Sequence, residues 1–303
     1  MPDVRDRRDR DRRDRDRRAP AVSRISPQRW SEVRVAVQDV GERFAHLVLS
    51  SDPAVMATAD WTVADTAAHV AAIAWQYTSL VVSYETERPI DGVRDLLLGT
   101  TVDNIHTGLN EAMRRNFTQR DPEALVATLR SSIARVLELT RDADPASTVV
   151  WLGGASLPRA GLLAHLTNEM LLHGRDIARA GGVPWPIPQE QAALFFDLFI
   201  VEIIRNGVGV LLDVAGPPRP GRIAVEFRSA YTTPVAVVVT DGVVSVEEPG
   251  RDVDVHLSFQ PAALNLMLFH HVGRLRTVLG GGVRVWGRRV WLLPAFLRKV
   301  RLP

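Results

Sequence analysis

The chain has 303 residues, about twice the length of a typical single domain, and 46% of them are hydrophobic, enough for two cores. It contains no cysteine, which excludes disulfides, thiolate-ligated metals and a cysteine nucleophile, so thiol chemistry would need a thiol from outside the chain. Residues 1–18 hold nine Arg and six Asp, and the rest of the chain has 28 basic against 29 acidic residues. Because its body is not basic, the chain does not have the charge pattern of a nucleic-acid-binding protein.

Residues 1–24 are predicted to form a disordered Arg/Asp-rich tail, because alternating charges leave little apolar surface to bury. The sequence has no apolar segment typical of a secretory signal, and its most apolar stretch, residues 194–214, is interrupted by charged residues. We therefore expect a cytoplasmic protein with no membrane or nucleic-acid partner.

Residues 25–215 are predicted to form a helical domain. Ser26 precedes a proline at the first helical position, and Thr62 with Asp65 has the pattern of a capping box. Asp121, also followed by a proline, marks another helix start. The helical spacing of apolar residues then predicts helices over residues 30–48, 62–84, 102–117, 121–140, 158–180 and 189–212.

The pattern changes at residues 216–221, a run of Gly and Pro that favours a linker or a tight loop. Beyond it, alternating apolar residues predict strands over residues 223–227, 235–239, 243–246, 253–259 and 283–286. Asp241 and Gly242 predict a hairpin turn, and helices are predicted over residues 261–271 and 292–300. The sequence thus predicts an α+β protein, in which a helical bundle is followed by a small α+β domain at residues 216–303.

One polar stripe on the predicted helix over residues 158–180 could carry chemistry. Its members lie three or four residues apart and return to the same helix face: His165, Glu169, His173 and Asp176. On an earlier helix, His69 lies in an alanine-rich stretch that is otherwise expected to be buried. A histidine from one helix can meet a Glu-x-x-x-His pair from another, and two imidazoles with one carboxylate suit zinc.

The spacing alone leaves a structural interpretation open, because one buried histidine is more often a hydrogen-bonded core residue than a ligand. His165 could be a fourth ligand, a donor to a ligand or a helix residue one turn before the site, and we favour the last two. Asp176 is expected to orient an imidazole or to cap the helix rather than to bind a metal. The other histidines have no partner at an informative spacing and are interpreted as structural: His46, His106, His256, His270 and His271.

Two stretches resemble the mycothiol-dependent maleylpyruvate isomerase family, which belongs to the DinB-like metal-binding four-helix bundles. Residues 61–69 are similar to the family's Trp-Thr-Val…His block. Residues 169–180, followed by Gly182, Pro184 and Trp185, are similar to its second block. Residues 58–60, Thr-Ala-Asp, depart from the Cys-Pro-Gly that the family often has before its Trp. Residues 221–300 also resemble the small sterol-carrier-like C-terminal domain found in this family.

The resemblance implies that His69, Glu169 and His173 bind a divalent metal, with zinc expected, and that one coordination position stays open. It also implies that mycothiol, the small-molecule thiol of actinobacteria, binds there as a thiolate. Coordination to a dication would deprotonate a thiol that is mostly protonated at neutral pH. In the isomerase, the thiolate would add to the cis double bond of maleylpyruvate, allow rotation and leave to give fumarylpyruvate.

Two classes of function are compatible with the sequence. The first is a mycothiol-dependent metalloenzyme that acts on a small electrophile, by cis-trans isomerisation or by S-transfer. The second is a binding or regulatory protein that keeps the bundle and the metal without turnover. The three intact ligands and the lack of cysteine favour the enzyme. The sequence assigns no catalytic or substrate-binding residue, although an arginine of the C-terminal domain would suit a carboxylate substrate.

Overall fold

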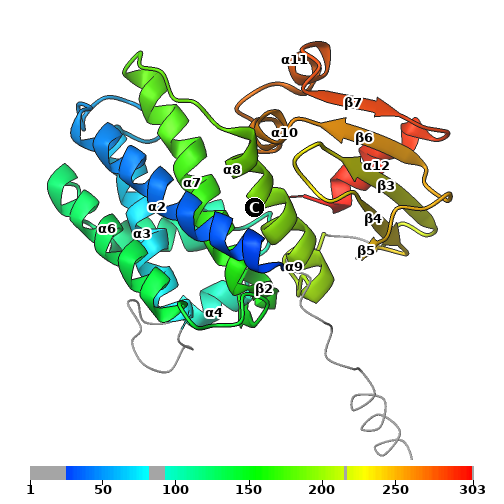
Figure 1. Ribbon diagram of the computed structural model, residues 1–303, viewed down its shortest axis with the longest axis horizontal. Coiled ribbons are helices and arrows are strands. Elements are labelled where there is room, and N and C mark those ends of the chain that lie inside the picture. Colours follow the sequence, from blue (N-terminus) through cyan, green and yellow to red (C-terminus); the bar gives the residue numbers. More distant parts are fainter. Residues whose placement is uncertain (1–24, 82–92, 215–216, 302–303) are drawn as a thin grey trace, which may run out of the picture.

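The fold is a bundle of long helices joined to a five-stranded sheet, with a further helical segment between them (Figure 1). The computed structural model describes residues 25–81, 93–214 and 217–301. The predicted tail at residues 1–24 lies outside these ranges. The expected fold class, a helical bundle followed by a small α+β unit, is confirmed. None of the described helices is long and apolar enough to cross a membrane.

The bundle consists of α2 (Pro27–Leu49), α3 (Val63–Leu80), α6 (Pro122–Leu139) and α7 (Arg159–Ala180). Three of these helices begin at the predicted caps. The side chains of Ser26 and Asp121 each accept a hydrogen bond from the backbone N–H three residues further on. Thr62 and Asp65 form the predicted capping box, in which each side chain bonds the other's backbone N–H. Local capping therefore sets where the bundle helices start.

The chain between α3 and α6 is broken into shorter pieces than the sequence predicts. In place of one helix over residues 102–117, the structure has a π-helical turn, η1 (His106–Asn110), followed by α5 (Glu111–Asn116). An additional short helix, α4 (Val93–Leu98), precedes them. The last part of the helix predicted over residues 62–84 falls in a range that is not described.

A small hairpin lies between α6 and α7, in a stretch where the sequence predicted no strand. Strands β1 (Thr148–Val150) and β2 (Ser156–Pro158) pair antiparallel around a short 3-10 turn, η2 (Leu152–Gly154). The reversal depends on Gly153 and Gly154, whose φ angles of 65° and 71° lie in the left-handed region that favours glycine.

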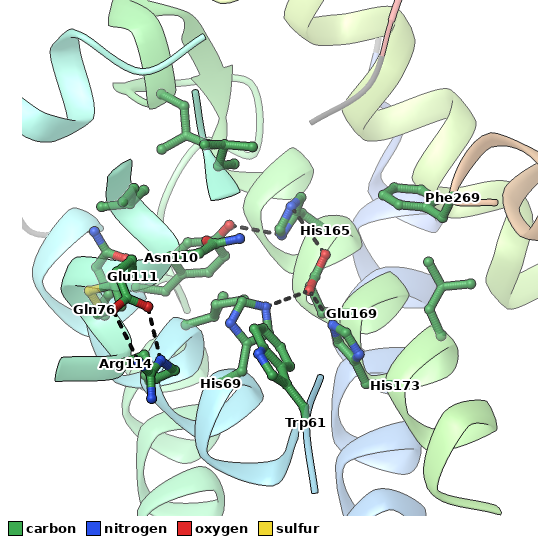
Figure 2. Close-up of a pocket in the computed structure, with 18 of the residues that line it drawn as sticks. Trp61, His69, Gln76, Asn110, Glu111, Arg114, His165, Glu169, His173 and Phe269 are labelled. Carbon is green, nitrogen blue, oxygen red and sulfur yellow. Dashed lines mark hydrogen bonds and ion pairs between the residues drawn. The ribbon is translucent and has the colours of Figure 1, made fainter. Parts of the chain in front are cut away.

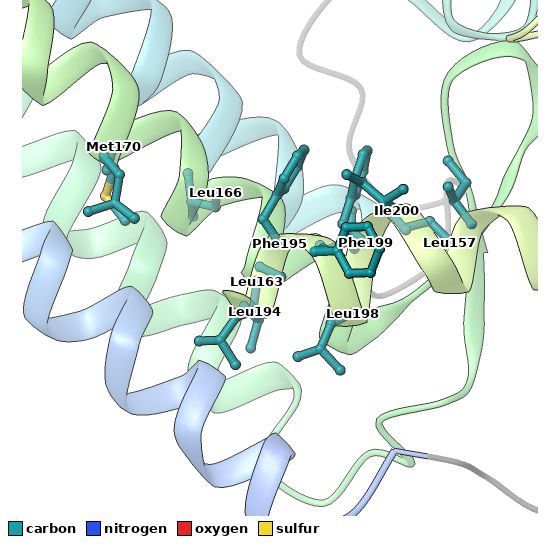
Figure 3. Close-up of a cluster of buried hydrophobic side chains, with 14 of the residues drawn as sticks. Leu157, Leu163, Leu166, Met170, Leu194, Phe195, Leu198, Phe199 and Ile200 are labelled. Atoms are coloured by element: carbon teal, nitrogen blue, oxygen red, sulfur yellow. The ribbon is translucent and has the colours of Figure 1, made fainter. Parts of the chain in front are cut away.

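The segment between the bundle and the sheet is an almost continuous helix with a π-helical turn inside it. It comprises α8 (Gln189–Leu194), η3 (Phe195–Ile200) and α9 (Val201–Asn206). It ends six residues before the predicted position, because Gly207 adopts φ 113°. Figure 3 shows Phe195 and Phe199 side by side on η3, next to leucines of α7. The π turn thus presents two aromatic rings to the bundle.

The sheet has the strand order β5-β4-β3-β6-β7, and all its pairs are antiparallel except β3 with β6. Its strands are β3 (Arg222–Arg228), β4 (Val235–Thr240), β5 (Val243–Glu247), β6 (Val255–Phe259) and β7 (Val283–Trp286). The predicted turn between β4 and β5 is confirmed, with Asp241 and Gly242 both at positive φ as a tight hairpin turn requires.

One face of the sheet packs against helices and shares their hydrophobic core. The helices of this part are α10 (Pro261–Leu268), α11 (Arg274–Leu279) and α12 (Leu293–Lys299), and the 3-10 turn η4 (Val290–Leu292) precedes α12. Phe227 of β3 and Phe259 of β6 both contact Phe196 of η3, with ring centroids 5.4 and 4.8 Å away. Asn265 of α10 donates a hydrogen bond to the side-chain oxygen of Asn168 on α7, at 2.9 Å. These contacts fix α10 beside α7.

A buried ion pair at this junction predicts a pH-dependent contribution to stability. The guanidinium of Arg29 donates to the carboxylate of Asp197 at 2.8 Å and also to the backbone carbonyl of Tyr231. Burial outweighs the nearby arginine and raises the pKa of Asp197 from its ordinary value of 3.8 to about 6. The folded state therefore holds this proton more tightly than the unfolded chain does. The resulting stabilisation is complete below pH 3.8 and is lost as the pH rises through about 6.

We predict that Asp197→Asn, which cannot titrate, removes this loss. The difference in free energy of unfolding, variant minus wild type, should therefore increase by roughly 2 to 3 kcal/mol between pH 4 and pH 7. Urea unfolding at a series of pH values measures this difference. The exposed Asp213→Asn is the matched control and should follow the wild-type profile. Parallel profiles for Asp197→Asn and the wild type would contradict the prediction.

Candidate functional site

Three side chains from two bundle helices point toward one another: His69 of α3, and Glu169 and His173 of α7 (Figure 2). The Nε2 atoms of His69 and His173 lie 3.5 and 3.4 Å from the same carboxylate oxygen of Glu169. The two imidazole planes are almost perpendicular, at 83°. One donor atom from each residue can be chosen so that all lie within 4.8 Å of one another. The packing of α3 against α7 therefore brings together the three residues that the sequence singled out.

Trp61 closes one side of this group. Its ring centroid lies 4.8 Å from that of His69 and 6.1 Å from that of His173. The loop that carries Trp61 is closed by its own hydrogen bonds, from the backbone N–H of Ala57 to the carbonyl of Trp61 and from the N–H of Trp61 to the hydroxyl of Thr58. The loop that departs from the family pattern thus still has a defined shape beside the site.

His165 contacts the other oxygen of Glu169, at 3.5 Å from its own Nε2. Its Nδ1 lies 3.0 Å from the hydroxyl of Tyr77, and the indole N–H of Trp151 donates to that same hydroxyl at 3.3 Å. Because an indole can only donate, the Tyr77 oxygen accepts from Trp151, and the Tyr77 hydroxyl can donate to Nδ1 of His165. With Nδ1 as the acceptor, the ring N–H of His165 is on Nε2, the atom that lies nearest the carboxylate of Glu169. His165 therefore lies where it can orient Glu169.

Aromatic rings surround His165 and remove it from water. The ring centroids of Phe195, Phe199 and Trp151 lie 6.3, 4.9 and 5.2 Å from that of His165. Burial lowers the pKa of His165 below its ordinary value, although the charge of Glu169 opposes the shift. His165 therefore stays neutral at physiological pH and can serve as a hydrogen-bond donor. The π-helical turn of η3 supplies two of these rings.

The electrostatics of the three converging residues favour a bound cation. Burial alone would raise the pKa of Glu169, but the surrounding histidines outweigh it and hold that pKa well below its ordinary range. Burial would likewise lower the pKa of His173, but its contacts with Asp176 and Glu169 raise the value to about 9. A carboxylate that stays ionised beside an imidazole that attracts a proton is a site where a proton and a metal ion compete.

Asp176 links His173 to the C-terminal part of the chain. One carboxylate oxygen lies 3.5 Å from Nδ1 of His173, and the other lies 3.1 Å from Nδ1 of His271. Burial would raise the pKa of Asp176, but the two imidazoles lower it to about 2. Asp176 therefore lies where it can orient an imidazole. His271, which has no partner at an informative sequence spacing, meets Asp176 because the chain turns back at His270, with φ 60°, after α10.

Two further residues of the second family-like block have a packing role. A side-chain Cβ at Gly174 would lie 2.3 Å from the ring of Trp185, closer than such atoms approach in proteins. The Trp185 indole N–H donates to the carbonyl of Leu171 at 2.9 Å, and the Arg43 guanidinium lies 4.5 Å over its ring. Glycine next to His173 therefore allows Trp185 to pack directly on α7 and to hold this turn of the helix in place.

The three residues lie in the wall of a cavity of about 530 Å³. Of the C-terminal part, Phe269 and His271 are among the described residues that line it. The arginine that lines the described wall is Arg114 of α5 and not an arginine of the C-terminal part. Arg114 makes two hydrogen bonds to Glu111, at 2.9 and 3.0 Å. The periodicity of α5 was too weak in the sequence to place either residue.

The fold and the cavity define a helical-bundle protein with a His₂Glu group at the edge of an enclosed pocket. Residues 51–178 match the family model of the mycothiol maleylpyruvate isomerase N-terminal domain, which confirms the resemblance over this part of the chain. Two crystal structures of the mycothiol-dependent maleylpyruvate isomerase, one of a mutant, are similar at 17% sequence identity and cover 78% of this chain and 87% of theirs. Their TM-scores are 0.46 for the mutant and 0.42 for the other. No curated protein matches the sequence significantly.

Proposed function

We propose that this protein is a metal- and thiol-dependent enzyme of the maleylpyruvate isomerase family. In this proposal, a divalent metal is held by His69, Glu169 and His173, and the thiol is mycothiol, which reacts with a small electrophile by isomerisation or S-transfer. The observation that carries the proposal is the convergence of these three side chains on one point of the cavity, within the domain that matches the family. The absence of cysteine from the chain supports a thiol that comes from outside.

Two of the three donor–donor separations match those around a tetrahedral ion. With metal–ligand bonds of about 2.0–2.2 Å, neighbouring donors of a tetrahedral zinc site lie roughly 3.3–3.5 Å apart. The separations of 3.4 and 3.5 Å between the imidazole nitrogens and the Glu169 oxygen agree with this spacing and are too long for good hydrogen bonds. Two imidazoles and one carboxylate are ligands that zinc accepts, and they leave a fourth position open. Zinc is therefore the metal we propose.

A dication held at this point would lower the pKa of a thiol that reaches the open position. The chain's own residues prepare the place. His165 and Tyr77 orient the carboxylate of Glu169, and Asp176 orients the imidazole of His173. The aromatic rings around His165 exclude water from this side of the cavity, so charges there interact more strongly than they would in solution. We further propose domain limits of residues 25–215 for the bundle and 216–303 for the C-terminal domain.

The proposal is tested by turnover with zinc-loaded protein, mycothiol and a panel of electrophiles that includes maleylpyruvate and neutral enones. Isomerisation is followed by the absorbance change of the substrate, and S-transfer by loss of free thiol. We expect turnover that needs both the metal and the thiol. Turnover that proceeds equally without thiol would favour a hydrolase instead. If the protein binds mycothiol but turns over none of the electrophiles, a binding protein would be favoured.

The contact between Asp176 and His271 gives a second prediction. Because partners behind a metal-binding histidine typically change metal affinity by 10- to 100-fold, His271→Ala should weaken zinc binding by about tenfold. Competition with a chromogenic chelator measures the affinity. His270→Asn is the matched control, since asparagine tolerates the positive φ at that position and His270 is outside the described cavity wall. Equal zinc affinity for all three proteins would mean that the C-terminal domain does not support the site.

A further inference from the structure

The cavity extends along α3 well beyond the three converging residues. His69, Ile73, Gln76 and Leu80 all line it, and their spacing of three or four residues places them on one face of the helix. With a rise of 1.5 Å per residue, His69 and Leu80 are separated by about 16 Å along the axis. The cavity is therefore a trough with the His₂Glu group toward one end, longer than a compact dicarboxylic acid needs.

The end of the trough away from His69 is apolar. The side chains that line it come from α3, α4, the chain before α5, and the hairpin: Leu80, Leu97, Ile105, Leu109, Trp151 and Leu152. Each of these residues is less than one-tenth exposed. A charged group placed among them would lose its hydration without a partner, at a cost of several kcal/mol. This end of the trough suits a hydrocarbon or aromatic body.

The charges around the trough do not suit a doubly anionic ligand. Three carboxylates are among the described residues that line it: Asp60, Glu111 and Glu169. Arg114 supplies the one permanent positive charge on that described wall, and it is already bonded to Glu111 through two nitrogens. A dication at the proposed site and the guanidinium of Arg114 together carry three positive charges. These only neutralise the three negative charges of the carboxylates. A thiolate and a dianion would add three uncompensated negative charges.

A buried amide nitrogen in the trough, that of Gln76, lacks a hydrogen-bond partner among the described residues. Gln76 is 8% exposed, and its side-chain nitrogen makes no hydrogen bond within the described parts of the chain. Figure 2 shows Gln76 with Glu111 and Arg114 on the side of the cavity opposite Glu169. A buried amide N–H without an acceptor is unfavourable by about 1–3 kcal/mol, so a ligand oxygen that accepts from it would bind favourably.

We propose that the substrate of this site is a predominantly apolar electrophile with one hydrogen-bond acceptor and at most one negative charge, such as an apolar α,β-unsaturated ketone. Its oxygen accepts a hydrogen bond from the amide of Gln76, and its apolar body lies among the side chains at the end of the trough near Leu80. The proposal rests on the thiol-dependent function above and narrows it, because it sets doubly charged acids such as maleylpyruvate aside.

The reaction with such a substrate is an addition across the carbon–carbon double bond. The thiol sulfur forms a bond to the β-carbon and the π electrons move toward the carbonyl oxygen. The proton released by the thiol is returned by solvent to the α-carbon, so one S–H bond and one π bond are exchanged for a C–S and a C–H bond. No oxidant or reductant is needed.

The test uses the full chain and three probes: benzylacetone, which is saturated and cannot react, its para-carboxylate, and maleate as a dianion. Isothermal titration of zinc-loaded protein without thiol should show benzylacetone binding roughly tenfold or more tighter than maleate, and also tighter than the para-carboxylate, whose single charge lies on the body that enters the apolar end. Gln76→Leu should weaken benzylacetone binding by about three- to tenfold, the value of one hydrogen bond. Gln38→Leu, an exposed glutamine on α2, is the matched control and should bind like the wild type.

Tighter binding of maleate than of benzylacetone to the wild type would overturn the proposal, whether or not Gln76→Leu folds. Equal affinity of Gln76→Leu, Gln38→Leu and the wild type for benzylacetone would also overturn it. Mycothiol consumption with benzylideneacetone, the unsaturated counterpart, separates the two proposals. If benzylacetone binds as expected but benzylideneacetone consumes no thiol, the thiol-dependent function fails and the ligand class stands. If maleylpyruvate is turned over faster than benzylideneacetone, the function stands and the ligand class fails.

Discussion

Replacing His69 or His173 with alanine should lower the metal content of the purified protein from close to one ion per chain to less than about a tenth of that. Each substitution leaves only two protein ligands, and the buried carboxylate of Glu169 would then attract a proton rather than hold an ion. Metal analysis after dialysis against a weak chelator measures the effect. The expected loss is large because only three donors lie together within 4.8 Å of one another in the described cluster, and each variant keeps two of them.

His46→Ala is the matched control for this prediction. His46 lies on α2, is exposed and is not among the described residues that line the cavity. Replacing it removes one histidine from the chain and should leave the metal content at the wild-type value. Circular dichroism of each variant checks that the bundle has formed. One ion per chain in folded His69→Ala and His173→Ala would show that the metal, if any, binds elsewhere.

The features that could be predicted from the sequence are those set by residues close together in the chain. Ser26, Thr62 and Asp121 mark helix starts because a capping side chain bonds a backbone N–H only three residues away. The polar stripe from His165 to Asp176 follows from helix periodicity alone. Its meeting with His69 needed a resemblance to a family, because periodicity does not say which helices are neighbours.

The features that could not be predicted depend on contacts between distant segments. His271 contacts Asp176 across 95 residues, through a reversal at His270 that no turn signature announces. The π-helical turn at residues 195–200 has an ordinary apolar sequence, and its departure from α-helical geometry was seen only in the structure. Gln76 could have been found, because it lies seven residues after His69 and so on the same face of α3, but an amide alone gave no reason to single it out.

The cavity depends on both kinds of feature. A site built only from α3 and α7 would be open on the side of the C-terminal domain. Phe269 and His271 line that side, and they are held there because α10 packs beside α7 through Asn265 and Asn168. The C-terminal part thus contributes Phe269 and His271 to the described wall of the cavity, and none of its described strands lines that wall.

Binding of mycothiol should depend completely on the metal and should release protons. Three protein ligands leave a tetrahedral ion one ligand short, and a thiol that fills this position loses its proton near neutral pH. We expect zinc-loaded protein to bind mycothiol with the release of close to one proton, measured by calorimetry in buffers of different ionisation enthalpy. Chelated protein and His173→Ala should bind at least about a hundredfold more weakly, since only the contacts to the rest of the thiol remain. S-methyl mycothiol, which has no thiol proton, is the matched ligand control. Its affinity should be the same for zinc-loaded and chelated protein.

Replacing zinc with cobalt gives an independent signal, because a sulfur-to-cobalt absorption band should appear when the thiol is added. Equal affinity of mycothiol for loaded and chelated protein would separate thiol binding from the His₂Glu group and leave that group a structural role.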